Sequence, residues 1–142
     1  MGPWVSIVTL GVRDLKSAGT FYEEGLGWTP SAASNADIVY FRLGAVVLAL
    51  YPRRVLAAEA GLGDSGRGFD GVTLSHNVTS RAAVDEALRE AVAAGGTILK
   101  FGREMAWGGY AGHLTDPDGH VWEIAWNPNL KLKRDGRLVL PK

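Results

Sequence analysis

Hydrophobic and polar residues follow two kinds of pattern along the first half of the chain, one typical of strands and one typical of a helix. Residues 4–12, 38–44 and 45–52 are rich in β-branched and aromatic residues, which is typical of strands. Between the first two segments, the apolar residues of segment 15–27 recur at helical spacing. The pattern predicts a strand, a helix and then a hairpin whose tight turn lies at Gly44.

The same order of elements returns in the second half. A strand is predicted at residues 70–78, a helix within residues 80–96, and strands at residues 97–107 and 112–126, the last interrupted by a turn at residues 116–119. Ser, Thr, Asp and Asn favour helix N-caps, and a serine begins the helical segment. The predicted apolar stripe of this helix comprises Val84, Leu88 and Val92.

The two halves also share a tripeptide, since Val8-Thr9-Leu10 recurs as Val72-Thr73-Leu74. A repeat of about 60 residues indicates two similar units that stack to bury their faces. We therefore predict an α+β fold of two βαβββ modules forming one domain. Its expected parts are module one at 4–56, a linker at 57–68, module two at 69–127 and a C-terminal tail or hairpin at 128–142.

Composition narrows the functional classes. Fifteen basic and fifteen acidic residues balance, whereas nucleic-acid-binding proteins usually carry basic excess. The chain contains no cysteine, which excludes disulfides, thiol nucleophiles and zinc–thiolate sites. No apolar run reaches the length of a bilayer span. We expect a cytoplasmic protein that binds a small molecule and neither nucleic acid nor membrane.

Two motifs and the duplicated order together resemble a known superfamily. The motifs are "VRDLKSAGTFYEEGLGW" at residues 12–28 and "DPDGHVWEIAW" at residues 116–126. In these features the chain resembles the vicinal oxygen chelate superfamily, which includes glyoxalase I, extradiol dioxygenases and bleomycin-resistance proteins. The resemblance implies a curved, cup-shaped sheet that holds the ligand, and a homodimer. It does not fix the reaction, because one fold hosts many functions.

The resemblance also implies where metal ligands would lie in metal-dependent members, one on the first and last strand of each module. Carried over to this chain, those positions are Ile7, Ala49, Gly71 and Glu123, with Thr73 as the alternative to Gly71. Three of the four lack a useful metal donor, while divalent cations need several nitrogen or oxygen donors. We therefore expect no metal cofactor.

The histidines of the chain leave open an alternative metal site at other positions. His76, His113 and Glu123 would together supply donors for a relocated site that binds Fe, Mn, Ni or Zn. The competing interpretation is that His76 packs near the following helix and that His113 is polar lining. Strand alternation places His120 on the face opposite Glu123.

Alternation along the strands also predicts the lining of the cup. The expected ligand-binding residues are Thr9, Tyr51, Thr73, Ser75, Trp107, Tyr110, His113 and Glu123. Trp107 and Tyr110 have an equally good interpretation as core residues. The remaining predicted lining is mostly apolar, which suits an aromatic or apolar ligand.

Two functions follow from this lining. The first is a metal-free small-molecule-binding protein similar to bleomycin-resistance proteins. The alternative is a glyoxalase-like, metal-dependent lyase, isomerase or dioxygenase with the relocated site. In a catalytic version without metal, Glu123 is the candidate catalytic residue and would act as a general base.

Overall fold

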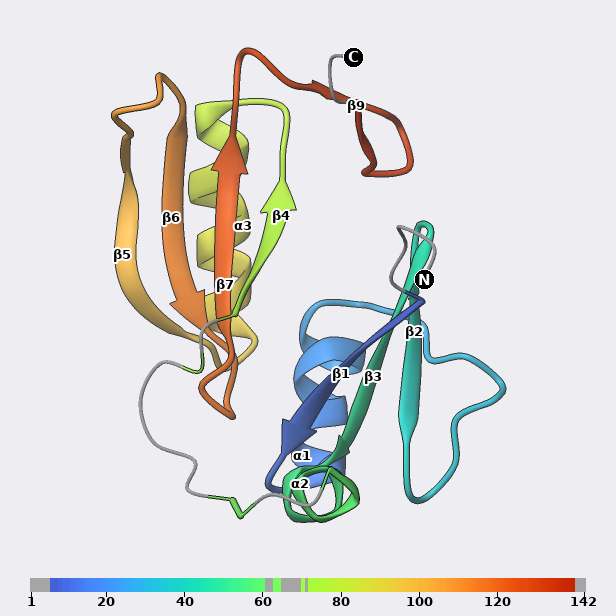
Figure 1. The fold of residues 1–142 in the computed structure, drawn as a ribbon. Helices are drawn as coiled ribbons and strands as arrows, with labels where there is room; N and C mark the ends of the chain where they lie inside the picture. Colours follow the sequence, from blue (N-terminus) through green and yellow to red (C-terminus); the bar gives the residue numbers. More distant parts are fainter. Residues whose placement is uncertain (1–5, 61–62, 65–69, 71, 140–142) are drawn as a thin grey trace. The chain divides into compact units, whose positions relative to one another are not determined.

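The computed structural model describes residues 6–60, 63–64, 70 and 72–139 (Figure 1). Residues 1–70 and 71–142 form two compact units, and each is described by itself. Much of the predicted linker, residues 61–62 and 65–68, lies outside the described residues, and so does Gly71.

The first unit has the predicted order of elements. They are β1 (Ile7–Val12), α1 (Leu15–Thr20), the π-helix η1 (Phe21–Gly25), β2 (Val39–Leu43), β3 (Val46–Pro52) and α2 (Arg53–Glu59). The Asp14 side chain accepts a hydrogen bond from the Ser17 amide at 2.7 Å and so caps α1. Gly44 turns between β2 and β3 with φ +59°, a conformation that glycine adopts without steric cost.

The sheet of the first unit has three strands in the order β1-β3-β2, with β1 parallel to β3. The fourth strand of a βαβββ module is reduced to a single bridge between Pro30 and Phe41. The segment around this bridge, "TPSAASNAD", contains few β-branched residues and forms turns instead. The module is therefore present with one strand almost lost.

Apolar side chains of one sheet face form the core of this unit with the helices. Leu10, Leu48 and Leu50 are buried there. Tyr22 of η1 is fully buried, and its ring lies 5.9 Å from Phe41 and 5.3 Å from Trp28. Aromatic pairs at these spacings add to the stabilisation that burial provides.

The second unit is a complete βαβββ module. Its elements are β4 (Thr73–Asn77), α3 (Arg81–Ala93), β5 (Thr97–Glu104), β6 (Tyr110–Thr115) and β7 (Val121–Trp126). The strand order is β4-β7-β6-β5, with β4 parallel to β7 and the other pairs antiparallel (Figure 1). The two sheets thus share one plan, in which the first and last strands of each module pair in parallel.

Helix α3 begins at the predicted cap, because the Ser80 hydroxyl accepts a hydrogen bond from the Ala83 amide at 3.1 Å. Val84 and Leu88 are buried against the sheet as predicted. Val92, the third residue of the predicted stripe, is 44% exposed instead. Val92 lines a groove between α3 and β5 together with Ile98 and Phe101.

Two register shifts interrupt the pairing of β5 with β6. One lies between Ile98 and Lys100, and the other between Lys100 and Arg103. Each extra residue reverses the face to which the following side chains point, because strand side chains alternate with a period of two. These bulges decide where the charged residues of β5 lie.

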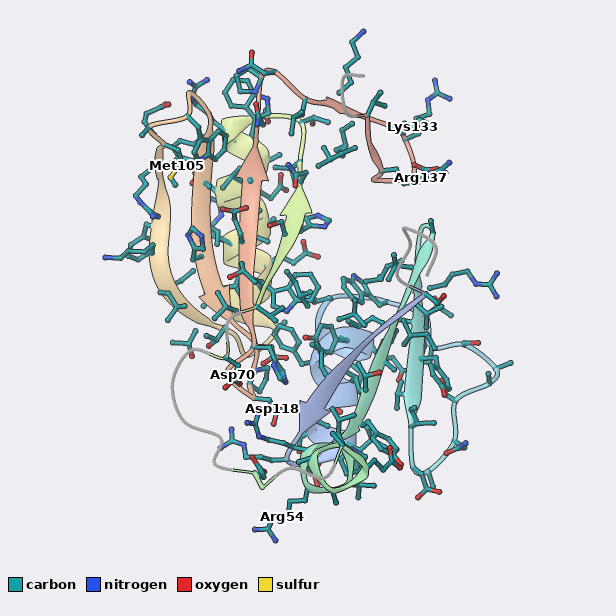
Figure 2. All side chains as sticks on the ribbon, in the orientation of Figure 1. Arg54, Asp70, Met105, Asp118, Lys133 and Arg137 are labelled. Carbon is teal, nitrogen blue, oxygen red and sulfur yellow. The ribbon has the colours of Figure 1, made fainter. Side chains whose placement is uncertain are left out.

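The C-terminal segment forms the predicted hairpin, although it is short. Strands β8 (Lys131–Leu132) and β9 (Leu138–Val139) pair antiparallel around Gly136, which has φ +81°. Figure 2 shows Lys133 and Arg137 on this hairpin, and the Arg137 guanidinium bonds Asp135 at 2.8 Å.

Candidate functional site

Helix α3 packs on one face of the sheet of the second unit. A Cβ atom added to Gly112 would lie 2.5 Å from Leu88 Cδ1, so Gly112 faces the helix. Gly112 pairs with Ile124, whereas the next pair is His113 with Glu123. Because successive side chains point to opposite faces, His113 and Glu123 lie on the face away from α3. We call this the open face.

Three polar side chains meet on the open face and form what we call the Ser–Glu–His cluster. The register aligns Ser75, Glu123 and His113 in one row across β4, β7 and β6. The Ser75 hydroxyl donates to Glu123 Oε1 at 2.9 Å, and His113 Nε2 lies 3.4 Å from Glu123 Oε2. The side chains of His113 and Glu123 are 21% and 25% exposed, so the cluster is accessible within this unit.

One nitrogen atom of this cluster lacks a hydrogen-bond partner among the described residues. His113 Nδ1 is buried and has no hydrogen-bond partner among the described residues. A carboxylate beside Nε2 favours a proton on that nitrogen, which makes Nδ1 an acceptor. An unpaired buried acceptor costs about 1–3 kcal/mol. Such a cost is rare in folded proteins and calls for a functional explanation.

The rest of the open face is more polar than the sequence predicted. Thr73 pairs with Val121, and Val121 with Thr115, so these residues share the face of the cluster. Lys100 pairs with His113, and Arg103 with Ala111, which places both cations on this face. The sequence reasoning missed them because it assigned no face to the bulged strand β5.

His76 lies on the other face of the sheet from His113 and Glu123, so a relocated metal site would have to form without it. It pairs with Ile124 and therefore points to the opposite face of the sheet from its neighbour Ser75. Burial lowers the pKa of His76, while the charge of Glu90 on α3 acts in the opposite direction. His76 is exposed on the edge strand β4, so this desolvation is only partial.

Tyr110 also lies on the helix-covered face, so it does not flank the open face as expected. Its hydroxyl donates to Asp85 of α3 at 3.0 Å. Burial, followed by this hydrogen bond, raises the pKa of the Tyr110 phenol. Trp107 lies in the turn between β5 and β6 and packs against Gly109, and it is 43% exposed.

The predicted residues of the first unit also share a face of their sheet. Thr9 pairs with Ala49, and Gly11 pairs with Tyr51. The Tyr51 hydroxyl donates to Glu59 of α2 at 2.9 Å, and this bond raises the pKa of the phenol. Thr9 is exposed, while Ala49 is buried.

The Ser–Glu–His cluster supplies few strong metal donors. Among the described residues, no three His, Asp or Glu side chains are grouped to hold an ion. The cluster supplies one carboxylate, one imidazole and one hydroxyl, which is a weak donor. Protein zinc sites use at least three strong ligands. The positions that the resemblance implies in the first unit, Ile7 and Ala49, carry apolar side chains.

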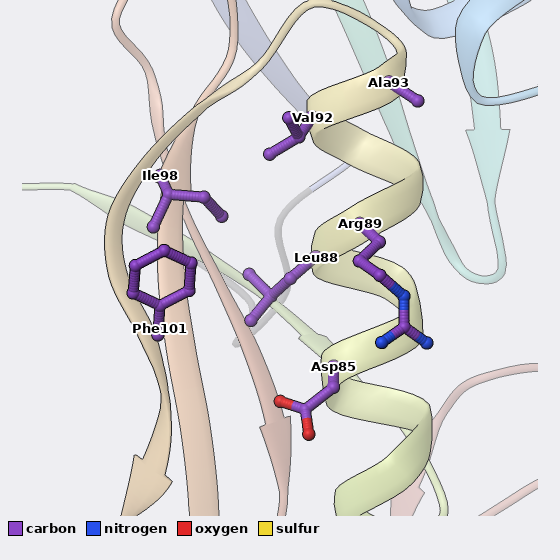
Figure 3. Close-up of a pocket in the computed structure, with 7 residues that line it drawn as sticks. All are labelled: Asp85, Leu88, Arg89, Val92, Ala93, Ile98 and Phe101. Carbon is purple, nitrogen blue, oxygen red and sulfur yellow. The ribbon is translucent and has the colours of Figure 1, made fainter.

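A groove of about 620 Å³ lies on the other side of the second sheet, between α3 and β5 (Figure 3). Its walls include Leu88, Val92 and Phe101, and the Phe101 side chain is 76% exposed. None of the predicted site residues lines it.

Within the residues that the structure describes, no helix has the length and apolar character needed to cross a membrane.

No curated protein matches the chain. Solved structures do match, and a glyoxalase-related enzyme from Fulvimarina pelagi is 35% identical over 99% of both chains, with a TM-score of 0.88.

Two further similar structures carry lower identity and show the fold alone. A glyoxalase/bleomycin resistance protein/dioxygenase family enzyme from Burkholderia phytofirmans PsJN is 23% identical, over 85% of this chain and 96% of its own, with a TM-score of 0.73. Lactoylglutathione lyase from Agrobacterium tumefaciens is 20% identical, over 89% and 96%, with a TM-score of 0.65.

The family profile described as Glyoxalase/Bleomycin resistance protein/Dioxygenase superfamily matches residues 4–124. This match includes the first module, the second module as far as the middle of β7, and the Ser–Glu–His cluster. The chain therefore belongs to the Glyoxalase/Bleomycin resistance protein/Dioxygenase superfamily, with the α+β fold that its sequence predicted.

Proposed function

We propose that this protein binds a small organic molecule on the open face of the second sheet and that binding needs no metal ion. The observation that carries the proposal is the Ser–Glu–His cluster. It combines an accessible row of hydrogen-bonding side chains with a buried nitrogen of His113 that has no partner among the described residues. Few polar groups at the centre of a face are typical of small-molecule sites.

The donor set supports binding without metal. Both oxygens of Glu123 already face polar partners, Ser75 on one side and His113 on the other. A metal ion would have to replace these partners and find further ligands. Ligand binding only requires that a hydroxyl, amine or amide of the ligand meets the carboxylate or imidazole.

The neighbouring residues favour an apolar or aromatic body for the ligand. Val121 precedes Glu123 on the open face and is half-buried, so it offers apolar contact beside the cluster. Ala111 and Ala125, in the next row, are buried and offer none. An apolar contact beside a polar centre suits the ligand expected for a protein that resembles the bleomycin-resistance branch.

A second candidate is proton transfer without a cofactor. It is favoured by the distance of 3.4 Å between Glu123 Oε2 and His113 Nε2, which lets the imidazole orient the carboxylate. Glu123 would take a proton from a bound ligand as general base, within hydrogen-bond reach of it. His113 would act as a positioning residue.

The experiment that tests binding combines metal analysis with a ligand screen. Purified protein is analysed for metal after loading with Mn, Fe, Ni or Zn and desalting. A library of aromatic metabolites and antibiotics is then screened in the presence of EDTA by ¹H–¹⁵N correlation spectra. We expect less than stoichiometric metal and saturable shifts centred on Ser75, His113 and Glu123.

Variants separate the alternatives. We expect Glu123→Gln to weaken binding about tenfold, since hydrogen bonds to a charged group contribute about 1.5–3 kcal/mol. Tyr110→Phe, on the helix-covered face, is the matched control and should leave binding unchanged. Stoichiometric metal that Glu123→Ala removes would overturn the proposal in favour of a metal-dependent lyase, isomerase or dioxygenase.

The homodimer that the resemblance implies stays a prediction. Light scattering coupled to gel filtration measures it directly, and a mass of twice 15.2 kDa is expected.

A further inference from the structure

Two cations lie on the open face beside the Ser–Glu–His cluster. Lys100 is the direct cross-strand neighbour of His113, and Arg103 is the neighbour of Ala111 in the adjoining row. Both side chains are exposed. Neither forms an ion pair with any of the described residues.

The bulges of β5 are the reason that both cations share this face. Ile98 pairs with Leu114, which is buried on the helix side, so a regular strand would direct Lys100 to that side as well. The first register shift turns Lys100 to the open face. Residue 103 would then face α3, and the second shift returns Arg103 to the open face. Bulges often re-aim side chains next to binding sites.

The acidic residues near this pair are engaged elsewhere. Glu104, the next residue on β5, binds Arg81 at 2.6 Å and pairs with Tyr110, which faces α3. Glu123 is two strands away from Lys100 and contacts Ser75 and His113. Adjacent strands lie about 4.8 Å apart, so the Cα atoms of Lys100 and Glu123 are separated by roughly 10 Å.

We propose that the open face selects a small organic anion, whose carboxylate, phosphate or sulfate group binds Lys100 and Arg103 while its body lies over the Ser–Glu–His cluster. This inference rests on the proposed function and adds the charge of the ligand to it. Two neighbouring cations repel each other, and a bound anion removes this repulsion. Arg also binds carboxylate and phosphate oxygens in pairs of parallel hydrogen bonds.

The test uses matched pairs of probes that differ in charge, benzoate with benzamide and phenyl phosphate with phenol. Each is titrated into the full chain at low salt, and binding is measured by ¹H–¹⁵N spectra. We expect the anion of each pair to bind about tenfold tighter than its neutral partner, and the preference to shrink as added salt screens the charges.

Variants assign that preference to β5. Lys100→Gln combined with Arg103→Gln should remove the preference for the anion and leave the neutral probes unchanged. Arg89→Gln, on α3, removes a cation from the other side of the sheet and should preserve it. Because residues 100 and 103 are exposed, the double variant should fold, and circular dichroism checks this.

The outcomes separate the two proposals. Equal binding of anion and neutral probe, with shifts at Ser75 and Glu123, would overturn the anion preference and keep the proposed function. A preference that persists without the two cations would also overturn it. Shifts confined to residues of the groove beside α3, or an absence of shifts on the open face, would count against both proposals.

Discussion

The close approach of α3 to β6 predicts that Gly112→Ala destabilises the second unit. The added Cβ would lie 2.5 Å from Leu88 Cδ1, 3.0 Å from the Lys100 carbonyl oxygen and 3.1 Å from the Gly102 nitrogen. Leu88 is only 3% exposed, and the other two atoms belong to the backbone of β5. The neighbours therefore cannot all yield freely. Overpacking of this kind costs about 1–3 kcal/mol.

The assay is thermal unfolding followed by circular dichroism. Each kcal/mol lowers the Tm of a domain of this size by about 2–8 °C. Gly19→Ala is the matched control, because a Cβ there meets nothing within 4 Å and the residue lies in α1. It should raise stability by about 0.5–1 kcal/mol. The two substitutions are chemically identical and should act in opposite directions.

A double-mutant cycle tests the mechanism of this effect. Leu88→Ala alone should cost about 2–5 kcal/mol, because it leaves a cavity in the core. Combined with Gly112→Ala, the cost should be less than the sum, since one of the three crowded atoms is gone. Additive costs would show that Leu88 is not the obstacle. An unchanged Tm for Gly112→Ala would refute the close approach itself.

Three further predictions concern the same unit. Tyr110→Phe removes the hydrogen bond to Asp85 and should lower the free energy of unfolding by about 1 kcal/mol in urea titrations, and a gain in stability would contradict this contact. The pKa of His76 is lowered in the folded state from its ordinary value of 6.5, which the unfolded chain keeps. The folded state therefore binds this proton less tightly than the unfolded chain does. Stability should therefore be complete above pH 6.5 and decline as pH falls through the lowered folded pKa, and His76→Gln should flatten this decline in unfolding curves. Asp116→Ala removes the acceptor of the Asp118 and His120 amides and should cost about 1–3 kcal/mol, and an unaltered urea midpoint would mean that this turn forms without it.

The sequence by itself determined the elements and their order. The strands of each module, the caps at Asp14 and Ser80 and the turn at Gly44 follow from local patterns that act over a few residues. Helix N-caps and positive-φ turns depend on side-chain and backbone chemistry that is present before any tertiary contact forms. The two motifs and the duplicated order of elements likewise indicated the superfamily that the comparisons show.

The tertiary structure decided which side chains meet. Ser75, His113 and Glu123 are far apart in sequence, and only the register of β4, β7 and β6 places them in one row. The same register separates His76 from Glu123, because a shift of one residue reverses the face of the sheet.

The placement of Lys100 and Arg103 shows the same limit of sequence reasoning. Strict alternation directs residues three apart to opposite faces, and the register shift between Lys100 and Arg103 brings them to the same face. A bulge arises where the pairing with β6 and the packing on α3 are satisfied together, so it is a property of the assembled unit. Sequence patterns predicted the strand β5, whereas its pairing within the sheet determined the face on which Lys100 and Arg103 lie.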